Sequence, residues 1–469
     1  MGPFHRMVFP GRPRGRHGFG FWAVTFAFVT VIAFGTVPAP LYSLYQERDD
    51  FSAFVVTIVF AAYAIGSVVS LFLAGHVSDW HGRRRILVPA MLLEIAAGVV
   101  FLVCPALPGL LVARSLTGLA VGAFTATATA WLAELHAAHR PGGSGRRAQV
   151  VATAANLGGF GVGAAGSGAL AQWAGHPLTV PYVVFVVALA VAVLLVLATP
   201  ETRPAMTPRP RYRPQRVSVP QHARGLYVAA ATGMLIVFAQ LGLFTSLAPN
   251  YLAGTLHHAS IALAGAVTLM VFSSAVVAQI ATAKSSVHRV LRAGVVTVLI
   301  GLALLVGAVW LPTPSLAAFL AGGVVSGLGG GLLFRGTVGT VGSLAPADSR
   351  AEALAGLFLA GYAGLTVPVI GLGLLDLYAT PQVGLLVFAG VLALIALMTA
   401  PTLLHRPDPT AETAGIPWYR IRIGDAIGTP MHHEPSSRAC ENGWPGKQDR
   451  RPGPRWRLPR IVRAPREVR

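Results

Sequence analysis

Residues 54–74 read FVVTIVFAAYAIGSVVSLFLA, and residues 75–85, which follow directly, read GHVSDWHGRRR. The first stretch contains no charged residue and is long enough for an α-helix to cross a hydrocarbon core of about 30 Å. The second stretch is polar and ends in three arginines, which is typical of a loop at a membrane surface. Together they predict a transmembrane helix followed by a charged loop.

The same alternation of apolar runs and polar loops extends over most of the 469 residues. Only 11% of the residues are charged, whereas a soluble globular chain carries about 25%. We therefore predict an all-α membrane protein of about twelve transmembrane helices, six on each side of a central polar segment. The predicted helices cover Phe21–Leu41, Phe54–Ala74, Leu87–Val103, Leu107–Leu132, Val150–Ala171, Val180–Ala198, Leu226–Leu247, Ile261–Ala281, Gly294–Leu311, Leu316–Val338, Leu354–Leu375 and Val383–Leu403.

The composition divides the chain into five parts. A basic N-terminus at 1–19 precedes a six-helix bundle at 20–199, and a second six-helix bundle covers 226–404. The segment 200–225 between them is rich in Pro and Arg, as a flexible linker is. The tail at 405–469 shows no periodic pattern, and we expect it to be disordered. It either contacts anionic lipid or has no specific role.

The basic residues predict the orientation in the membrane. All but three of the 36 Lys and Arg lie on the side of the two termini; Arg114 and Arg335 fall within spans, and Arg48 falls on the opposite side. Because positive residues are retained in the cytoplasm, we predict a plasma-membrane protein with both termini cytoplasmic. Topology accounts for the net charge of +19, so we expect no nucleic acid partner.

The loop at 75–85 resembles the signature loop of the major facilitator superfamily, G-x-L-x-D-R-x-G-R-R/K. Trp80 stands where the family usually has Arg. Asp79 can pair with a nearby guanidinium, and Gly82 permits the tight turn that two adjacent spans need. The resemblance assigns the loop to gating at the cytoplasmic face. The matching residues are Gly75, Asp79, Gly82, Arg83 and Arg84.

Three further segments resemble the same family. Residues 114–122, RSLTGLAVG, are similar to its fourth-helix pattern of a buried Arg followed by spaced glycines. Residues 156–163, NLGGFGVG, are similar to the Gly-rich fifth helix of its drug/proton antiporters, although Ala164 replaces the usual Pro. The sequence Pro-Glu-Thr at 200–202 recurs in the family. The resemblance implies two six-helix bundles with pseudo-two-fold symmetry around a central cavity, with access alternating between the two sides.

Three charged residues lie inside predicted spans, where a charge at mid-helix costs about 2.5–3.5 kcal/mol on insertion scales. Glu94 is either a proton-coupling carboxyl or a neutral side chain that is hydrogen-bonded between helices. Arg114 needs a counter-ion, a carbonyl or water, and is either a cavity residue or a structural one. Arg335 lies in the span equivalent to that of Arg114 and either shares its role or extends to the cytoplasmic interface.

Uncharged polar residues in the spans are further candidates for the cavity. Asn156 and Gln240 lie in mid-span, and Tyr63 and Tyr362 are possible aromatic neighbours of a substrate. Each of the four is either a ligand contact or the partner in an interhelical hydrogen bond.

These features predict a secondary active transporter that moves a small organic solute, with proton-coupled efflux of drugs or metabolites as the leading hypothesis. Proton-coupled import of a sugar or other metabolite is one alternative, and a non-transporting membrane sensor is another. We expect a monomer in the lipid bilayer that binds protons and a small-molecule substrate. The sequence contains no nucleotide-binding loop and no catalytic or metal-ligand pattern that we would defend. We therefore expect no enzyme activity, no cofactor and no metal.

Overall fold

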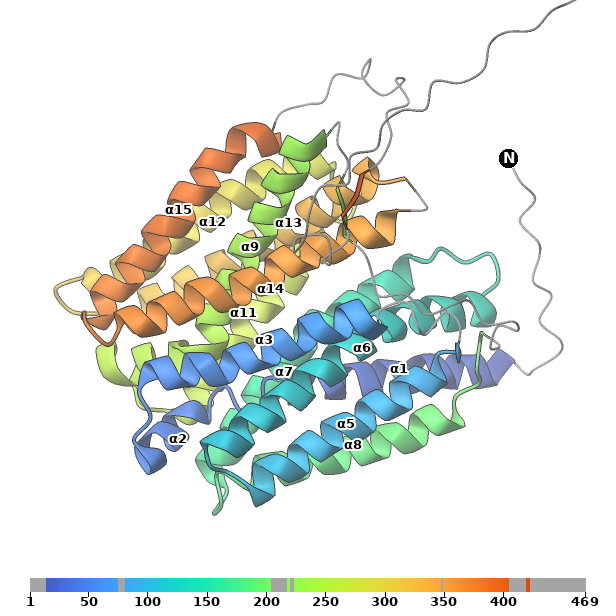
Figure 1. The fold of residues 1–469 in the computed structure, drawn as a ribbon, viewed down its shortest axis with the longest axis horizontal. Coiled ribbons are helices and arrows are strands. Elements are labelled where there is room, and N and C mark those ends of the chain that lie inside the picture. Colours follow the sequence, from blue (N-terminus) through green and yellow to red (C-terminus); the bar gives the residue numbers. More distant parts are fainter. Residues whose placement is uncertain are drawn as a thin grey trace, which may run out of the picture. The chain divides into compact units, whose positions relative to one another are not determined.

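The structure is a computed structural model that describes residues 14–74, 81–203, 217–219, 223–346, 349–404 and 419–421. Within this part of the chain, twelve helices of 19 residues or more lie side by side (Figure 1). Eleven of them are long and apolar enough to cross a membrane, judged by length and composition. The predicted all-α membrane fold with about twelve spans is confirmed.

The first half of the chain contains six of these long helices and one short helix. They are α1 (Arg14–Phe34), the short α2 (Tyr42–Asp49), α3 (Ala53–Ala74), α5 (Arg84–Val103), α6 (Leu107–His139), α7 (Arg146–Trp173) and α8 (Val180–Ala198).

The second half contains the other six long helices and two short ones. They are α9 (Arg224–Ser246), the short α10 (Ala248–Asn250), the π-helix η2 (Tyr251–Thr255), α11 (Ile261–Ala281), α12 (Val287–Trp310), α13 (Leu316–Leu344), α14 (Arg350–Leu375) and α15 (Pro381–Leu404).

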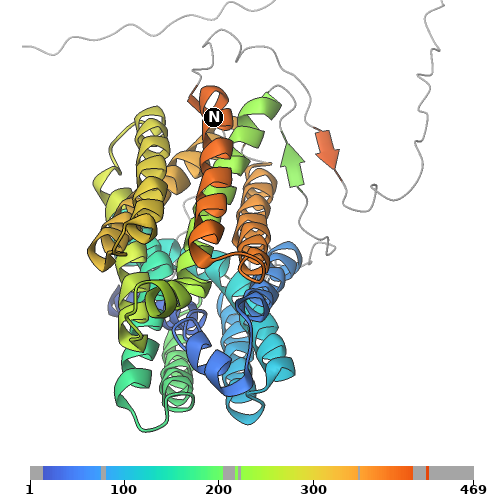
Figure 2. The same cartoon turned by 90° about the vertical axis from the view of Figure 1, so that its left-hand side faces the viewer.

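The helices of each half pack mainly on one another. In the first half α3 and α5 pack on α6, and α1 packs on α7 and α8; in the second half α12 packs on α13, and α9 packs on α14. Figure 2 shows the blue and cyan helices of the first half below the yellow to red helices of the second. The two halves meet mainly where α7 contacts α11 and where α3 contacts α14.

Helix α7 is the one long helix that is too polar to count as a span by composition. It contacts α1 on one side and α11 of the other half on another. Small residues allow the backbones of such neighbours to approach closely, and the buried positions of α7 are mostly Gly, Ala and Ser. Its low hydropathy therefore reflects packing between helices rather than a position outside the membrane.

The first helix ends earlier than we predicted. We expected a helix over 21–41, but α1 ends at Phe34, and residues 35–41 form consecutive turns closed by hydrogen bonds from residue i to residue i−3. Pro38 and Pro40 lack the amide hydrogens that a continuing α-helix would need. These turns are buried, and irregular backbone at membrane depth is tolerated where protein or a cavity surrounds it.

Two helices extend at their C-terminal ends well beyond the predicted residue. Helix α6 continues to His139 instead of ending near Leu132, and α13 continues to Leu344 instead of ending near Val338. Both therefore extend past the apolar stretch that defined the predicted span, because a helix can continue into the aqueous phase with a polar sequence.

Two strands occur in segments that we predicted to lack regular structure. In the predicted linker, β1 (Val217–Val219) pairs antiparallel with β2 (Tyr419–Ile421) in the predicted tail, with Ser218 opposite Arg420. Their sequences, VSV and YRI, contain the β-branched and aromatic residues that favour strands. The rest of the predicted tail, and the predicted N-terminus up to residue 13, lie outside the described residues.

Because successive long helices alternate in direction, the bundle has two ends. We call the end at which α8 ends and α9 begins the linker end, and the opposite end, which holds α2 and the turn between α14 and α15, the far end (Figure 1). The distribution of Lys and Arg predicts that the linker end is cytoplasmic.

A carboxyl at the far end predicts a pH-dependent stability. Asp376 follows the last residue of α14. Its Oδ1 is buried and has no hydrogen-bond partner in the part of the chain that the structure describes. Burial raises the pKa of this carboxyl from 3.8 to about 6. The folded state therefore binds this proton more tightly than the unfolded state, so its stabilising effect is complete below pH 4 and is lost as the pH rises through about 6. We expect Asp376→Asn to raise the melting temperature at pH 8 and to leave it nearly unchanged at pH 4.

The comparison that tests this is a melting curve of the purified protein at pH 4, 6 and 8 for wild type and Asp376→Asn. The exposed Glu47, replaced by Gln, is the matched control at the same end. Equal melting temperatures of wild type and Asp376→Asn at pH 8 would contradict the prediction.

Candidate functional site

The far end is closed where α7 and α11 cross between the halves. A Cβ on Gly168 would lie 2.6 Å from the carbonyl oxygen of Ile261, and a Cβ on Gly265 would overlap the carbonyl oxygen of Ala164. No side chain fits between these backbones, so the two helices are in direct contact. Gln172 adds a polar link across the junction, because its Oε1 accepts a hydrogen bond of 3.0 Å from the backbone N–H of Ile261, the first residue of α11.

A second contact closes the far end between α3 and α14. A Cβ on Gly373 would lie 2.6 Å from the Cγ2 of Thr57. The methyl and the hydroxyl of Thr57 therefore fill the space that this glycine leaves. Both contacts between the halves are thus built on glycines near the far end.

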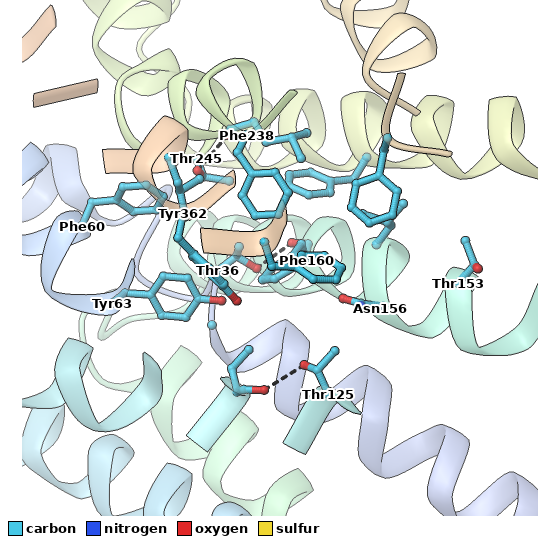
Figure 3. Close-up of a pocket in the computed structure, with 18 of the residues that line it drawn as sticks. Thr36, Phe60, Tyr63, Thr125, Thr153, Asn156, Phe160, Phe238, Thr245 and Tyr362 are labelled. Carbon is cyan, nitrogen blue, oxygen red and sulfur yellow. Dashed lines mark hydrogen bonds between the residues drawn. The ribbon is translucent and has the colours of Figure 1, made fainter. Parts of the chain in front are cut away.

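A cavity of about 180 Å³ lies where the two halves meet (Figure 3). Its wall includes residues of α3, α6 and α7 from the first half and of α9, α11, α13 and α14 from the second. Figure 3 shows Phe160 between Tyr63 and Asn156, with Phe238 and Tyr362 facing it from the second half. A cavity shared by both halves is the position in which a bound solute contacts each of them.

A second cavity, of about 340 Å³, adjoins the first toward the linker end. The two share Thr153, Gln279 and Phe334 in their walls. The second cavity is also lined by Arg146 and Val287, the exposed first residues of α7 and α12. The second cavity therefore extends from the wall of the central cavity to the linker end, whereas glycine contacts join the two halves at the far end.

Arg114 stabilises the irregular segment that follows α1. Its Nη1 donates a hydrogen bond of 2.7 Å to the carbonyl oxygen of Gly35, and Gly35 lines the central cavity. The guanidinium also lies 4.7 Å from the ring centroid of Tyr63 and 5.4 Å from that of Phe60, both of which line the cavity. Arg114 is thus behind the cavity wall, bound to a carbonyl and two aromatic rings.

Glu94 lies behind the same wall. Its side chain in α5 is fully buried, and neither carboxyl oxygen has a hydrogen-bond partner in the described part of the chain. It interacts electrostatically with Arg114 and with Tyr63, without forming an ion pair with Arg114 at contact distance. The interhelical hydrogen bond that we considered for Glu94 is thus not formed among the described residues. The carboxyl interacts with Arg114 and Tyr63 through longer-range electrostatics.

Three buried tyrosines form a group next to Arg114, and the sequence did not single them out. Tyr42 and Tyr45 of α2 point into the first half, and the hydroxyls of Tyr45 and Tyr182 are 3.1 Å apart. Tyr42 and Tyr182 both interact electrostatically with Arg114. Tyr42 and Tyr45 lie on an eight-residue polar helix without an apolar pattern, so only the fold reveals that Tyr42 and Tyr182 lie near Arg114.

Arg335 lies apart from the central cavity. Its guanidinium donates hydrogen bonds to the carbonyl oxygens of Thr282 and Ala283, and it lines only the second cavity. It therefore binds the C-terminal end of α11, where a cation is favourable for the helix dipole. Arg114 and Arg335 occupy different environments, although their helices correspond in order.

The uncharged candidates divide into two groups. Three of them line the central cavity: Tyr63 of α3, Asn156 of α7 and Tyr362 of α14. Gln240 is buried in α9 and does not line the cavity, and neither its amide N nor its amide O has a hydrogen-bond partner among the described residues.

The family follows from a direct comparison of the sequence. A model of the major facilitator superfamily matches residues 18–312, which is more than half of the chain. The chain belongs to the major facilitator superfamily. It is therefore a multi-pass protein of a membrane transporter superfamily, as the loop at 75–85 predicted. No curated protein matches the sequence.

Solved transporters share the fold. A mutant of the nucleoside transporter NupG has a TM-score of 0.64 and 12% identity, covering 82% of this chain and 99% of that one. A mutant of the peptide transporter POT gives 0.65 and 14%, covering 84% and 96%. A POT family transporter in complex with 5-aminolevulinic acid gives 0.64 and 13%, also covering 84% and 96%. At these identities the likeness shows the fold alone.

The described part of the superfamily loop joins three helices at the linker end. The Arg83 side chain forms an ion pair of 2.8 Å with Glu134 of α6, and the Thr202 hydroxyl donates a hydrogen bond of 2.6 Å to the same carboxylate. Glu201 accepts hydrogen bonds from the backbone N–H groups of Arg83 and Arg84, at 3.0 and 2.9 Å. Gly75 and Asp79, which we also assigned to this loop, lie outside the described residues.

Gly82 and the glutamates explain the local sequence. Gly82 has a φ of +95°, and a Cβ there would lie 3.1 Å from the Glu201 carboxylate. Glycine is therefore required both by the backbone and by the approach of Glu201. Glu134 and Glu201 were absent from our candidates; the Pro-Glu-Thr sequence at 200–202 was the available signal for Glu201.

Removal of the Glu201 carboxylate should destabilise the linker end. The carboxylate binds two free N–H groups at the start of α5, so Glu201→Ala removes a helix cap, which typically costs about 0.5–2 kcal/mol. We expect a lower melting temperature in detergent for Glu201→Ala and an unchanged one for the exposed control Glu47→Ala. Equal melting temperatures for the two variants would show that this cap contributes nothing.

Proposed function

We propose that this protein is a proton-coupled secondary transporter that exports a small organic solute across the plasma membrane by alternating access. The observation that carries the proposal is a central cavity between the two halves that is adjoined by a second cavity toward the linker end, while glycine contacts join the halves at the far end. This is the arrangement that a transporter needs in order to load solute from one side only. With both termini in the cytoplasm, the cavity faces the cytoplasm, and a monomer is sufficient to form it.

Glu94 is the candidate for the proton site. A buried carboxyl without a hydrogen-bond partner is costly as an anion in apolar surroundings, so loading and releasing its proton depends on water or charge reaching it. Arg114 connects the site to the cavity, since it interacts with Glu94 and stacks on Tyr63 of the wall. Movement of the wall can therefore change the field at Glu94. We assign Arg114 to coupling, and we assign Arg335 to the linker-end path.

The cavity wall favours export of an organic compound over import of a sugar. A sugar needs hydrogen-bond partners for most of its hydroxyls, whereas eight of the nineteen residues in this wall are Phe or Tyr. The similarity of 156–163 to the fifth helix of drug/proton antiporters supports the same direction. Import by proton symport is the alternative within the superfamily.

Transport in reconstituted vesicles tests this function. A panel of dyes, drugs and sugars is presented to vesicles with an imposed pH gradient, and both solute accumulation and proton movement are recorded. We expect accumulation of an apolar compound against its own gradient, with protons moving in the opposite direction, and none in protein-free vesicles. Movement of protons and solute in the same direction would indicate symport, and absence of any coupled movement would favour a non-transporting protein.

A further inference from the structure

The central cavity carries no formal charge on its wall. Among the described residues that line it, none is Asp, Glu, Lys, Arg or His. An ion that leaves water for such a cavity loses its hydration and gains no counter-ion, and this costs several kcal/mol or more. The wall therefore supplies no counter-ion to a charged solute of either sign.

The nearest buried charge does not compensate for this. Arg114 lies behind Tyr63 and Phe60, and its guanidinium already binds the carbonyl oxygen of Gly35. It cannot reach an anion in the cavity without leaving these partners. Its positive charge also repels a cation in the cavity beside Tyr63. The guanidinium already occupies one face of the Tyr63 ring, so that face is not free to bind a cation.

Aromatic side chains form the walls of the cavity from both halves. Rings on two sides form a slot in which a planar group can stack, and stacked or edge-on pairs contribute about 0.5–1.5 kcal/mol beyond simple burial. The ring centroids of Phe160 and Phe272, which approach from α7 and α11, are 5.4 Å apart. The aromatic lining residues are Phe60, Tyr63, Phe160, Phe238, Phe272, Phe334, Phe358 and Tyr362.

Two amides, one from each half of the chain, are among the hydrogen-bonding groups of the wall. Three threonine hydroxyls of the wall donate to backbone carbonyls, as Thr36 does to Phe160 over 2.6 Å. The side-chain Nε2 of Gln279 in α11 is buried and has no hydrogen-bond partner among the described residues. Asn156 of α7 lies on the same side of the slot as Thr153 (Figure 3). Amide N–H groups donate to carbonyl oxygens, so this side of the cavity fits the polar edge of a solute.

We propose that the solute is an uncharged, planar aromatic compound that carries a carbonyl or equivalent acceptor, with its ring between the aromatic walls and its acceptor toward Asn156 and Gln279. This inference rests on the proposed function in assigning the cavity to the transported solute. It narrows the substrate to one chemical class and excludes zwitterions, organic anions and organic cations as preferred solutes.

Three probes of nearly equal shape test the class: 2-naphthamide, which is neutral, 2-naphthoate, which is an anion, and 2-naphthamidine, which is a cation. Binding to the purified, reconstituted protein is measured from the fluorescence of the naphthyl group. We expect 2-naphthamide to bind at least about tenfold more tightly than either ion. Tighter binding of the anion or of the cation would overturn the proposal.

Variants of the two amides test the position of the acceptor. Asn156→Leu and Gln279→Leu each remove one donor, and we expect each to weaken 2-naphthamide binding about two- to tenfold, the value of one hydrogen bond. Gln240→Leu is the matched control, because its amide is also inside the helix bundle but lies outside the wall. Equal affinities for the two cavity variants and wild type would show that the solute binds elsewhere.

The binding assay separates this proposal from the proposed function. Selective binding of 2-naphthamide without gradient-driven transport would leave the ligand class standing and contradict transport. Gradient-driven transport that prefers charged compounds would leave transport standing and contradict the ligand class.

Discussion

The Glu94→Gln variant is expected to fold like the wild type, to bind solute, and to lose gradient-driven transport by a factor on the order of tenfold or more, as expected for loss of a typical coupling free energy. Glutamine has nearly the same volume as glutamate, but its amide cannot bind and release a proton as a carboxyl does. Because no hydrogen bond to the Glu94 carboxyl exists in the described part of the chain, the substitution breaks none. We therefore expect Glu94→Gln to fold normally and to lose the coupling of solute transport to the proton gradient.

Two transport modes distinguish a coupling role from a structural one. Exchange of labelled for unlabelled solute needs no net proton movement and should survive in Glu94→Gln, while accumulation driven by the pH gradient should disappear. Glu352→Gln is the control, since Glu352 in the first turn of α14 also has a carboxyl oxygen without a partner but lies at the linker end. Accumulation by Glu94→Gln at the wild-type rate would reduce Glu94 to a packing residue.

The spans could be predicted because each is a local property of the sequence. A run of about 20 apolar residues is sufficient to define a membrane helix whatever its neighbours are, and Val180–Ala198 and Ile261–Ala281 agree with the prediction residue by residue. The end of α1 could not be placed in this way, because Gly35 to Leu41 is as apolar as the helix before it. Pro38 and Pro40 were the local evidence for the break.

The cavity was only partly predictable, for a physical reason. Polar residues in mid-span stand out, and Tyr63, Asn156 and Tyr362 were identified for that reason. A phenylalanine that faces a cavity has the same sequence signature as one that faces lipid or a helix, so residues such as Phe160 and Phe272 carry no local signal. Glu94 and Arg114 were identified by charge, but their position behind the wall depends on the crossing of helices.

The glycines of α7 illustrate the same limit. In the sequence they carried only a resemblance to a glycine-rich fifth helix, which could not indicate that α1 lies on one side of α7 and α11 of the other half on another. Gln172 is the penultimate residue of this helix and accepts a hydrogen bond from the first residue of α11. In the sequence it is a polar residue at the end of a span, with nothing to distinguish it from a solvated one.

Opening of the far end is the expected effect of Gly168→Leu. A Cβ at this position would lie 2.6 Å from the backbone oxygen of Ile261, which cannot rotate away as a side chain can. Overpacking of this kind costs about 1–3 kcal/mol, or roughly 5- to 150-fold in population, and the cost falls only on the state in which α7 and α11 touch. The variant should favour the state that is open at the far end and lose transport.

Access of a thiol reagent measures this shift. Thr245 lines the cavity, so Thr245→Cys, in a chain whose Cys104 and Cys440 are replaced by Ala, reports whether a membrane-impermeant reagent can enter from the far side. We expect labelling to be faster in Gly168→Leu by roughly 5- to 150-fold, the same factor as the population shift. Gly158→Leu on the same helix is the matched control, because a Cβ there meets no described atom within 4 Å.

The variant Gln172→Ala tests the α7–α11 contact without adding a larger side chain to it. Gln172→Ala deletes the hydrogen bonds to the start of α11 without overpacking the contact, so it should shift labelling of Thr245→Cys in the same direction by a smaller factor, about two- to tenfold for one hydrogen bond. A misfolded Gly168→Leu would show a lower melting temperature and poor solute binding, whereas Gln172→Ala should retain both. Unchanged labelling in both variants would mean that the α7–α11 contact does not hold the far end closed, and closure would then depend on α3 and α14.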